Sequence, residues 1–477
     1  MFPDDILIEI FDLYLADATS YFVYDSQAWH RLVCVCRRWR YVIFALPRSL
    51  DLRLVITEST PAKQMLDVWP SFPIVVTNSF HHKVSKPVFD GGDNLIDALN
   101  HHDVVCHINL RNLGRLWEKP ALAAVMQEPF PELTHMELRS DSEMPLALPD
   151  AFLGGSAPRL RTLRLNSISF PALPNLLLSA RHLVKLRLWR IPNTGYIPPE
   201  AIVICLSALT SLESLTIGFQ SPRSRPDTDT TNRRPPRPTW AVLPALTEFS
   251  FYGASEYIDE LAARIDAPRL ECLHLSFFNQ LIFDLPRLAQ FVGRAENFTL
   301  LKRSKVVFGR DGVEMIFDSP VGHRGLWLSL RVACRELDWQ IWSMAQLCSL
   351  PSRHLCHVEE LRIHGHGVHS SGPGIHSSWQ SEWHEDLDPT QWLELFHPFI
   401  ALQSLYVSGN LGKLVASALQ ELRGESTEVL PALRSLFFEV SHLSTSDARR
   451  SVWKPIQGFL TTRRSSDHPV DFHWDYQ

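Results

Sequence analysis

Apolar residues near the start of the chain follow the spacing of a helix. Over residues 2–15 they recur at steps of three and four along two adjoining stripes: Leu7, Phe11, Tyr14 and Leu15, and Ile6, Ile10 and Leu13. Pro3 suits the first turn of this helix, and Asp4 and Asp5 suit the positive end of its dipole. The resulting apolar surface is wider than one packing partner requires.

A second amphipathic helix is predicted to begin with Ser26 as its N-cap and to end before Pro47. Its apolar residues form one unbroken stripe: Trp29, Leu32, Cys36, Trp39 and Ile43. Two such helices cannot bury all of their apolar surface against each other. Two interpretations stay open: the helices cap the core that follows, or the surplus apolar face binds another protein.

The rest of the chain repeats a short apolar frame with the pattern apolar-x-x-apolar-x-apolar. It occurs at Leu133/Met136/Leu138, Leu160/Leu163/Leu165, Leu183/Leu186/Leu188, Leu212/Leu215/Ile217, Leu246/Phe249/Phe251, Leu270/Leu273/Leu275, Val358/Leu361/Ile363, Leu402/Leu405/Val407 and Leu433/Leu436/Phe438. In five units a proline stands two residues ahead: "PELTHMEL", "PRLRTLRL", "PALTEFSF", "PRLECLHL" and "PALRSLFF". Chance would give about one such combined match at this apolar content. The early units are spaced within the roughly 20–29 residues of leucine-rich repeats.

Each frame predicts a short strand that turns alternate side chains to opposite faces. Leu163 and Leu165 point inward, whereas Arg164 points outward onto a concave face shared by the repeats. Each strand needs its neighbours to cover it, and segments such as residues 193–209 are predicted to supply the intervening helices. The asparagine that regularises such repeats occurs only at Asn410, so a regular horseshoe is not expected.

Further elements are predicted around and within the repeats. "LDLRLVI" and "FPIVVTN" predict strands on either side of the helical "PAKQMLDVW". A hairpin is predicted over 306–317, turning at Gly309-Arg310-Asp311-Gly312, followed by a helix over about 333–349. Asp388 and Pro389 predict the start of a helix with three core residues: Trp392, Phe396 and Phe399.

Composition limits the class of protein. The chain has 477 residues, of which 45% are hydrophobic and 21% charged, enough for more than one core. A net charge of −6 argues against a general nucleic-acid binder. Eight cysteines without a CxxC pair favour a reducing compartment. Since no apolar stretch approaches the length of a membrane span, we expect a cytoplasmic or nuclear location and no membrane partner.

Two polar stretches admit more than one interpretation. The Pro- and Arg-rich residues 221–239 predict a disordered insertion, with a phosphorylated regulatory loop as the alternative. The His-rich residues 364–388 predict a flexible loop, and zinc binding is the less favoured alternative because no Cys pair or HExxH accompanies them. No phosphate loop, nucleophile elbow or paired carboxylates are present, so neither catalysis nor a cofactor is expected.

The first two helices resemble the F-box motif. The resemblance rests on Pro3 with Ile6-Leu7 and Ile10-Phe11, then Leu32, Val35-Cys36 and Trp39-Arg40. Phe2 replaces the usual Leu, and "YLADATSYFVYDSQA" makes the connection longer than usual. F-box domains dock onto the Skp-type adaptor of SCF ubiquitin ligases. The resemblance therefore implies these adaptor-binding residues: Pro3, Ile6, Leu7, Ile10, Phe11, Leu32, Val35, Cys36 and Trp39.

Nearly the full length resembles the large F-box family of mushroom-type (basidiomycete) fungi, through stretches such as "LDVWPSFPIVV", "TQWLELFHPF" and "HPVDFHWD". The implied fold is α/β. A small helical F-box domain covers 1–48, and an irregular leucine-rich-repeat-like solenoid covers 49–477.

The implied function is that of a non-catalytic substrate receptor, linked through the adaptor to a cullin ligase and binding an unknown protein target. If the repeat strands form, their outward residues are the candidate target contacts: Arg164, Arg187, Trp189, Tyr252, His274, Arg362, Tyr406 and Phe437. The alternative is a non-ligase repeat scaffold or sensor whose N-terminal helices only cap the solenoid.

Overall fold

The structure is a computed structural model that describes residues 2–20, 28–45, 52–68, 72–78, 92–142, 145–222, 240–280, 282–319, 325–348, 356–365, 388–408, 411–422, 429–439 and 446–475. Most of the Pro- and Arg-rich stretch and most of the His-rich stretch lie outside the described residues, as do Ser26, Pro47 and Asn410. The contacts divide the chain into two compact units. The first comprises the residues up to Ile197 with Ala208–Leu212, and the second comprises Pro198–Ser207 and nearly all residues from Glu213 onward.

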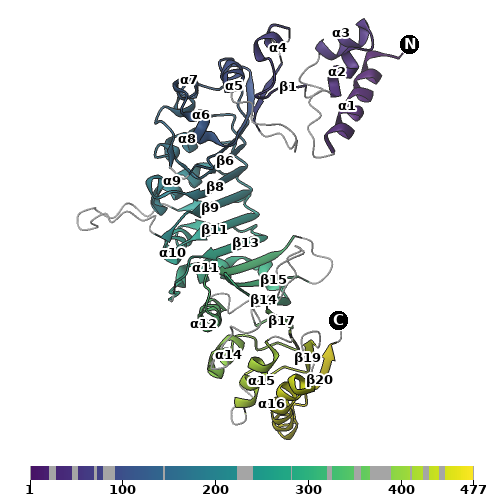
Figure 1. The fold of residues 1–477 in the computed structure, drawn as a ribbon, viewed down its shortest axis with the longest axis vertical. Coiled ribbons are helices and arrows are strands. Elements are labelled where there is room, and N and C mark those ends of the chain that lie inside the picture. Colours follow the sequence, from purple (N-terminus) through teal and green to yellow (C-terminus); the bar gives the residue numbers. More distant parts are fainter. Residues whose placement is uncertain are drawn as a thin grey trace, which may run out of the picture. The chain divides into compact units, whose positions relative to one another are not determined.

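The first unit begins with three helices, α1 (Asp4–Ser20), α2 (Ala28–Val33) and α3 (Arg37–Ala45) (Figure 1). The prediction of one continuous second helix was wrong, because the chain turns between α2 and α3. The backbone N–H of Val35 bonds to the Leu32 carbonyl, and Cys36 Sγ accepts a hydrogen bond from the N–H of Trp39. Steps of three and four residues continue across this turn, so apolar spacing alone does not reveal it.

The remainder of the first unit is a parallel sheet with its strands in chain order. These are β1 (Leu54–Ile56), β2 (Ile74–Thr77), β3 (Val105–Leu110), β4 (His135–Arg139), β6 (Thr162–Asn166) and β8 (Lys185–Ile191). The connections carry α4 (Ala62–Val68), α5 (Gly92–Leu99), α6 (Leu113–Trp117), α7 (Pro120–Val125), α8 (Leu173–Ser179), the 3-10 helices Phe152–Gly155 and Asn193–Gly195, and a two-stranded pair, β5 (Leu146–Ala147) with β7 (Ile168–Ser169).

The second unit continues this pattern with an insertion. In sheet order its strands are β9 (Ser214–Phe219), β11 (Glu248–Gly253), β13 (Cys272–Phe277), β16 (Trp327–Val332), β15 (Gly312–Asp318), β14 (Arg303–Gly309), β17 (Glu360–Gly365), β18 (Ser404–Val407), β19 (Ser435–Glu439) and β20 (Asp471–Asp475). Neighbours are parallel, except that β15 is antiparallel to both β14 and β16.

The described helices of the second unit are α9 (Pro199–Ala208), α10 (Ser255–Ala262), α11 (Pro286–Arg294), α12 (Leu337–Cys348), α14 (Pro389–Phe396), α15 (Gly412–Glu421) and α16 (Ser446–Ser465). A short 3-10 helix (Glu296–Leu300) follows α11, and β10 (Ala241–Val242) pairs with β12 (Ile265–Asp266). The helices that connect consecutive strands, such as α8 in the first unit and α10 and α11 in the second, lie along one face of the sheet (Figure 1).

The repeated apolar frame forms the core between strands and helices. Leu163 is 0% and Leu165 3% exposed, and in register they lie beside Leu186 and Leu188 of the next strand. Stacking of this kind buries every second residue of each strand. The predicted strands, the hairpin over 306–317 and the helix that follows Asp388 are confirmed, and Asp388 Oδ1 accepts the Thr390 N–H at 3.0 Å.

The observed class is mixed α/β, with a large, mostly parallel sheet and helices along it, consistent with a leucine-rich-repeat-like arrangement. All eight cysteines lie in the described residues, and none forms a disulfide. Among the described helices, none is long and apolar enough to cross a membrane.

Candidate functional site

The three N-terminal helices share a small apolar core. Leu7 is 4%, Phe11 0% and Leu32 7% exposed, and the Phe11 ring lies edge-on to the Trp39 ring with centroids 4.8 Å apart. The Arg38 guanidinium joins α3 to the start of α1, donating to Asp4 Oδ1 at 2.6 Å and to the Phe2 carbonyl at 2.7 Å. These contacts fix which stripe of α1 faces inward.

The second stripe of α1 remains exposed. We call these exposed residues the apolar N-terminal face; they come from α1, from the two residues before it and from the turn between α2 and α3: Phe2, Pro3, Ile6, Ile10, Leu13 and Val35. Ile6 is 40%, Ile10 41% and Val35 58% exposed. Ile6, Ile10 and Leu13 lie at helical spacing along one stripe of α1, and grouped apolar residues at a surface mark binding sites more often than isolated ones.

The residues predicted to bind an adaptor thus fall into two groups. Five are exposed: Pro3, Ile6, Ile10, Val35 and Cys36. Leu7, Phe11 and Leu32 belong to the internal core, and Trp39 is half-buried against it. The exposed residues can contact a partner directly. The core residues instead pack the helices together and so fix the positions of the exposed ones.

The second and third helices also contact the beginning of the sheet. Trp29 is 4% exposed, and its indole N–H donates to the Arg53 carbonyl at 3.2 Å. The Phe72 ring, just before β2, lies 5.2 Å from the Trp29 ring and 5.6 Å from the Phe44 ring. One side of α2 and α3 therefore contacts the residues that lead into β1 and β2.

On the sheet of the first unit, the predicted outward residues lie as expected. Arg164 and Arg187 are exposed neighbours in register, and Arg164 approaches Glu137 Oε2 at 3.4 Å. Trp189 lies two residues beyond Arg187 on the same strand, and the Arg187 guanidinium sits 5.5 Å from its ring.

A pair of histidines on this sheet was not predicted as part of the site. The rings of His107 and His135 stack with centroids 5.4 Å apart. Burial lowers the pKa of His107 to about 4, and the positive charges of His135, Arg53 and Arg164 act in the same direction. His107 is therefore neutral at physiological pH.

In the second unit, His274 belongs to a hydrogen-bonded chain. Ser329 Oγ donates to Glu314 Oε1 at 2.8 Å, so the His274 Nδ1–H donates to Ser329 Oγ at 3.0 Å. Burial lowers the pKa of His274, although the Glu314 carboxylate opposes this. Because Ser329 is 0% exposed, it orients His274 and is not a nucleophile that a substrate could reach.

The last strands carry a continuous row of stacked side chains, which we call the outward ladder: Arg362, Tyr406, Phe437 and His473. The Arg362 guanidinium lies 4.7 Å from the Tyr406 ring. The Tyr406 and Phe437 centroids are 4.3 Å apart with an interplanar angle of 6°, and those of Phe437 and His473 are 4.9 Å apart. Strand register places these residues side by side, one from each of β17 to β20.

Charged groups surround the outward ladder. Glu360 Oε1 pairs with Arg362 Nε at 2.6 Å. Burial raises the pKa of the Tyr406 hydroxyl, and the nearby Glu360 carboxylate adds to this effect. Burial lowers the pKa of His364 on the same strand as Arg362, with Lys305 as a second cause. The ladder is thus an apolar and aromatic strip between fixed charges.

Sequence reasoning identified three of the four ladder residues and missed His473. The signal that identifies His473 is the alternation in "DFHWD" (471–475). Phe472 and Trp474 point to the helix side of the strand, and His473 points to the outward side. Tyr252 is half-buried, with its ring edge-on to Phe278 at 4.9 Å.

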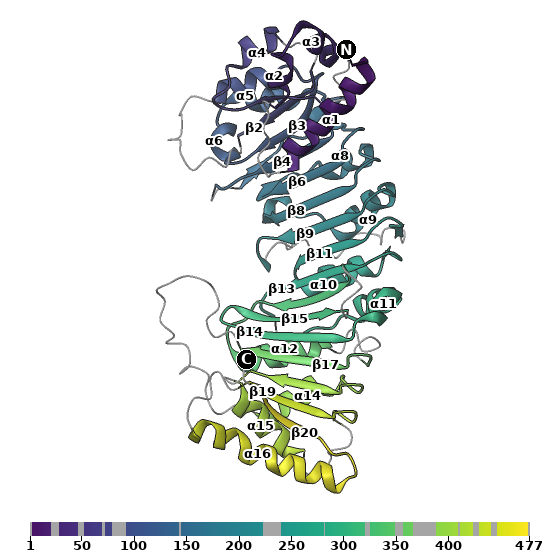
Figure 2. The ribbon, with the colours of Figure 1, turned by 90° about the vertical axis from the view of Figure 1, so that its right-hand side faces the viewer.

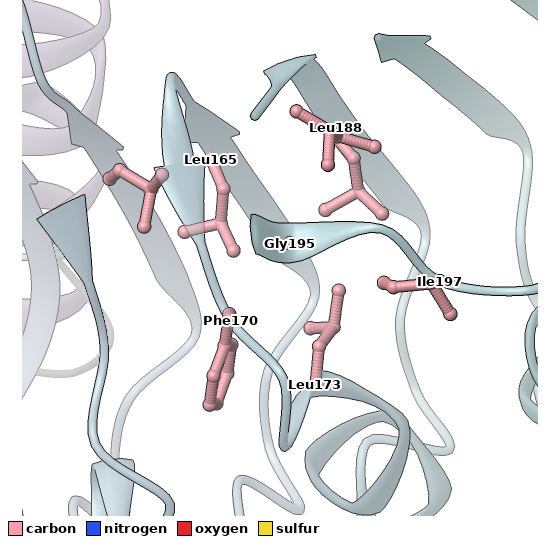
Figure 3. A pocket seen from close by; sticks show the side chains of 8 residues that line it. Leu165, Phe170, Leu173, Leu188, Gly195 and Ile197 are labelled. Atoms are coloured by element: carbon pink, nitrogen blue, oxygen red, sulfur yellow. The ribbon is translucent and has the colours of Figure 1, made fainter. Parts of the chain in front are cut away.

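In the described part of the chain, no group of three His, Cys, Asp or Glu residues is arranged to hold a metal ion. One cavity in the first unit is wholly lined by core residues, among them Leu165, Phe170, Leu188 and Ile197 (Figure 3). It measures about 10 Å³, too small for a substrate.

The fold and these surfaces define a repeat-type α/β protein with apolar and aromatic residues exposed on its helices and strands. No protein-family model and no curated protein matches the chain. The chain is similar to a solved structure, the leucine-rich repeat-containing protein LegL7 from Legionella pneumophila. That similarity has 12% sequence identity and a TM-score of 0.27, and it covers 85% of this chain and 97% of that one. It is too weak to support a conclusion about fold or function.

Proposed function

We propose that this protein is a substrate receptor of an SCF-type ubiquitin ligase. Its N-terminal helices bind a Skp-type adaptor, and the outward residues of its sheet bind a protein target. The observation that carries the proposal is the apolar N-terminal face, which remains exposed after the three helices have formed their own core. The F-box resemblance over residues 2–48 names the partner that such a face would fit.

The composition of the face supports direct binding. Exposed apolar residues that become fully desolvated supply most of the free energy of association in protein interfaces. Ile6, Ile10 and Val35 are such residues, while Arg38 and Asp4 hold the helices together from the side. The face is therefore preorganised, which reduces the entropic cost of binding.

The target-binding part of the proposal is supported by the outward ladder and by Arg164 and Arg187. Arginine and aromatic side chains are enriched at protein interfaces because they combine apolar contact with polar recognition. The receptor itself performs no chemistry in this proposal. It raises the local concentration of target lysines near the ubiquitin-loaded enzyme.

The proposal is tested by co-expression with a Skp-type adaptor and purification of the complex. Ile10→Glu places a charge on the apolar N-terminal face, and Ile204→Glu places the same charge on α9, where Ile204 is 45% exposed. We expect the wild type and Ile204→Glu to co-purify with the adaptor in equal amounts. Ile10→Glu should lose at least about tenfold in affinity, as expected for a central apolar contact.

Circular dichroism and thermal unfolding must show that both variants are folded. If the wild type is well folded and does not bind the adaptor, the ligase proposal fails. Equal binding by Ile10→Glu and the wild type would instead show that the adaptor uses another surface.

The alternative, helices that only cap the repeats, is favoured by the contacts of Trp29 with Arg53 and Phe72. It predicts that removing these contacts with Trp29→Ala lowers the thermal stability of the first unit, while no adaptor binds. The zinc-binding alternative concerns residues that are mostly outside the described ones, and it stays a prediction to be tested by metal analysis of the purified protein.

A further inference from the structure

Among the described residues, the end of the second unit presents a strand with one open edge, next to an aromatic and cationic cleft. β20 is the terminal strand in the order of its sheet, and no described strand pairs with its other edge. The cleft between β20 and α16 is lined by Arg449, Arg450, Trp453, Phe472 and Trp474 and has a volume of about 500 Å³. Both views show α16 and β20 together at this end (Figures 1 and 2).

The backbone of β20 is oriented for strand addition. The N–H of Asp471 donates to the Arg434 carbonyl at 2.8 Å, so this residue and His473 direct their backbone groups toward β19. Alternation along a strand then directs the N–H and C=O groups of Phe472 and Trp474 away from the sheet. An open edge of this kind is a template for a further strand.

The side chains beside this edge are apolar and positively charged. The Phe472 ring lies 5.2 Å from the Trp453 ring and 5.0 Å from the Trp474 ring, and Trp453 is 39% exposed. Arg449 and Arg450 from α16 line the same cleft. Three aromatic rings, those of Trp453, Phe472 and Trp474, therefore lie beside the open edge of β20.

We propose that β20 and the cleft bind an extended segment of another protein by β-strand addition. The segment directs an apolar and an acidic side chain, two positions apart, toward the aromatic rings and the two arginines. Its opposite face is neutral or basic, because Asp471 and Asp475 lie on the other side of β20. This site is on the helix side of β20, opposite His473, and is therefore separate from both surfaces of the proposed function.

Charge argues against a second copy of this chain as the occupant. A symmetric dimer through β20 would pair two antiparallel strands about a two-fold axis. In the register that pairs all five residues of β20, centred on His473, Asp471 of one strand lies opposite Asp475 of the other, and like charges directly opposite each other destabilise a strand pair. A segment with acidic and apolar residues on one face meets no such repulsion.

The test is selection of random linear peptides displayed on phage against the purified full chain. A peptide built from the enriched sequences is then labelled with fluorescein and titrated by fluorescence anisotropy. The variant Arg449→Glu/Arg450→Glu reverses the charge of the cleft. Lys454→Glu/Arg464→Glu makes the same charge change at exposed positions of α16 that do not line the cleft.

We expect enriched peptides with acidic and apolar residues at alternate positions. Their affinity should fall at least about tenfold for the cleft variant and remain unchanged for the control variant. Methylation of alternate backbone nitrogens of the peptide should also abolish binding, because it removes the strand hydrogen bonds.

Three results would overturn the proposal. The first is that the wild type selects no peptides that the cleft variant fails to select, and the second is that peptides still bind after methylation of their backbone nitrogens. The third is self-association of the wild type that the cleft variant abolishes. The last would identify a second copy as the occupant. None of these results depends on whether the N-terminal helices bind an adaptor.

Discussion

Phe11 and Tyr41 illustrate how differently two aromatic residues of the N-terminal helices contribute to stability. Phe11 is 0% exposed and packs against Trp39, whereas Tyr41 is 74% exposed. Phe11→Ala should lower the free energy of unfolding by about 3–5 kcal/mol, through lost burial and the cavity left behind. Tyr41→Ala should change it by less than about 0.5 kcal/mol. Urea unfolding followed by circular dichroism checks both values, and equal effects would contradict the described core.

His107 makes stability depend on pH. Its pKa is 6.5 in an unfolded chain and about 4 in the folded protein, where burial and the charges of His135, Arg53 and Arg164 disfavour the imidazolium. As pH falls below 6.5, the unfolded state takes up a proton that the folded state does not. Stability is therefore lost progressively between pH 6.5 and about 4.

The variant His107→Gln removes this proton linkage. We expect its melting temperature to fall less than that of the wild type when the pH is lowered from 7 to 5. His182→Gln, at an exposed position of the same unit, serves as the control and should follow the wild type. If His107→Gln and the wild type lose the same stability, His107 does not remain neutral in the folded protein.

Apolar spacing predicted the strands because each repeat places two frame residues on the inner face of its strand, as with Leu163 and Leu165. It did not distinguish the buried stripe of α1 from the exposed one, since both have helical periodicity. That distinction comes from contacts between distant residues: Arg38 with Asp4, and Phe11 with Trp39. The candidate site was therefore predicted at the level of elements, and only partly at the level of residues.

The cap at the start of α11 also depends on a contact between distant residues, which the local sequence does not predict. Asp259 on α10 accepts hydrogen bonds at Oδ1 from the backbone N–H groups of Arg287 and Leu288, both at 2.9 Å. It thereby caps α11 from a different helix and is itself only 9% exposed. Local sequence does not reveal this cap, because donor and acceptor are separated by 28 or 29 residues.

Asp259→Ala should therefore destabilise the second unit by about 2–3 kcal/mol, since two helix N–H groups lose their acceptor. Asp388→Ala removes a cap that is local and exposed to solvent, and we expect a smaller loss. Urea unfolding of both variants provides the comparison. A larger effect at Asp388 would show that the cap between helices contributes little.

For the whole molecule, the proposed function requires two bound partners at once. The apolar N-terminal face belongs to the first unit and the outward ladder to the second, so each surface can be changed without altering residues of the other. Changes at sites that share no partners have nearly additive effects. A variant that loses adaptor binding should therefore retain target binding, and the reverse should also hold.

This separation gives a test that identifies the target. Ile10→Glu should act as a trap, because a target bound at the outward ladder is no longer brought to the ligase and remains associated instead of being degraded. We expect specific proteins to co-purify with Ile10→Glu in larger amounts than with the wild type, measured by quantitative mass spectrometry. The same proteins should be lost when Tyr406→Ala and Phe437→Ala are added, because these remove the stacked rings of the ladder. Enrichment that persists without the two rings would place target binding elsewhere on the sheet. Equal recovery with Ile10→Glu and the wild type, while adaptor binding is lost, would contradict the coupling of the two surfaces in one degradative function.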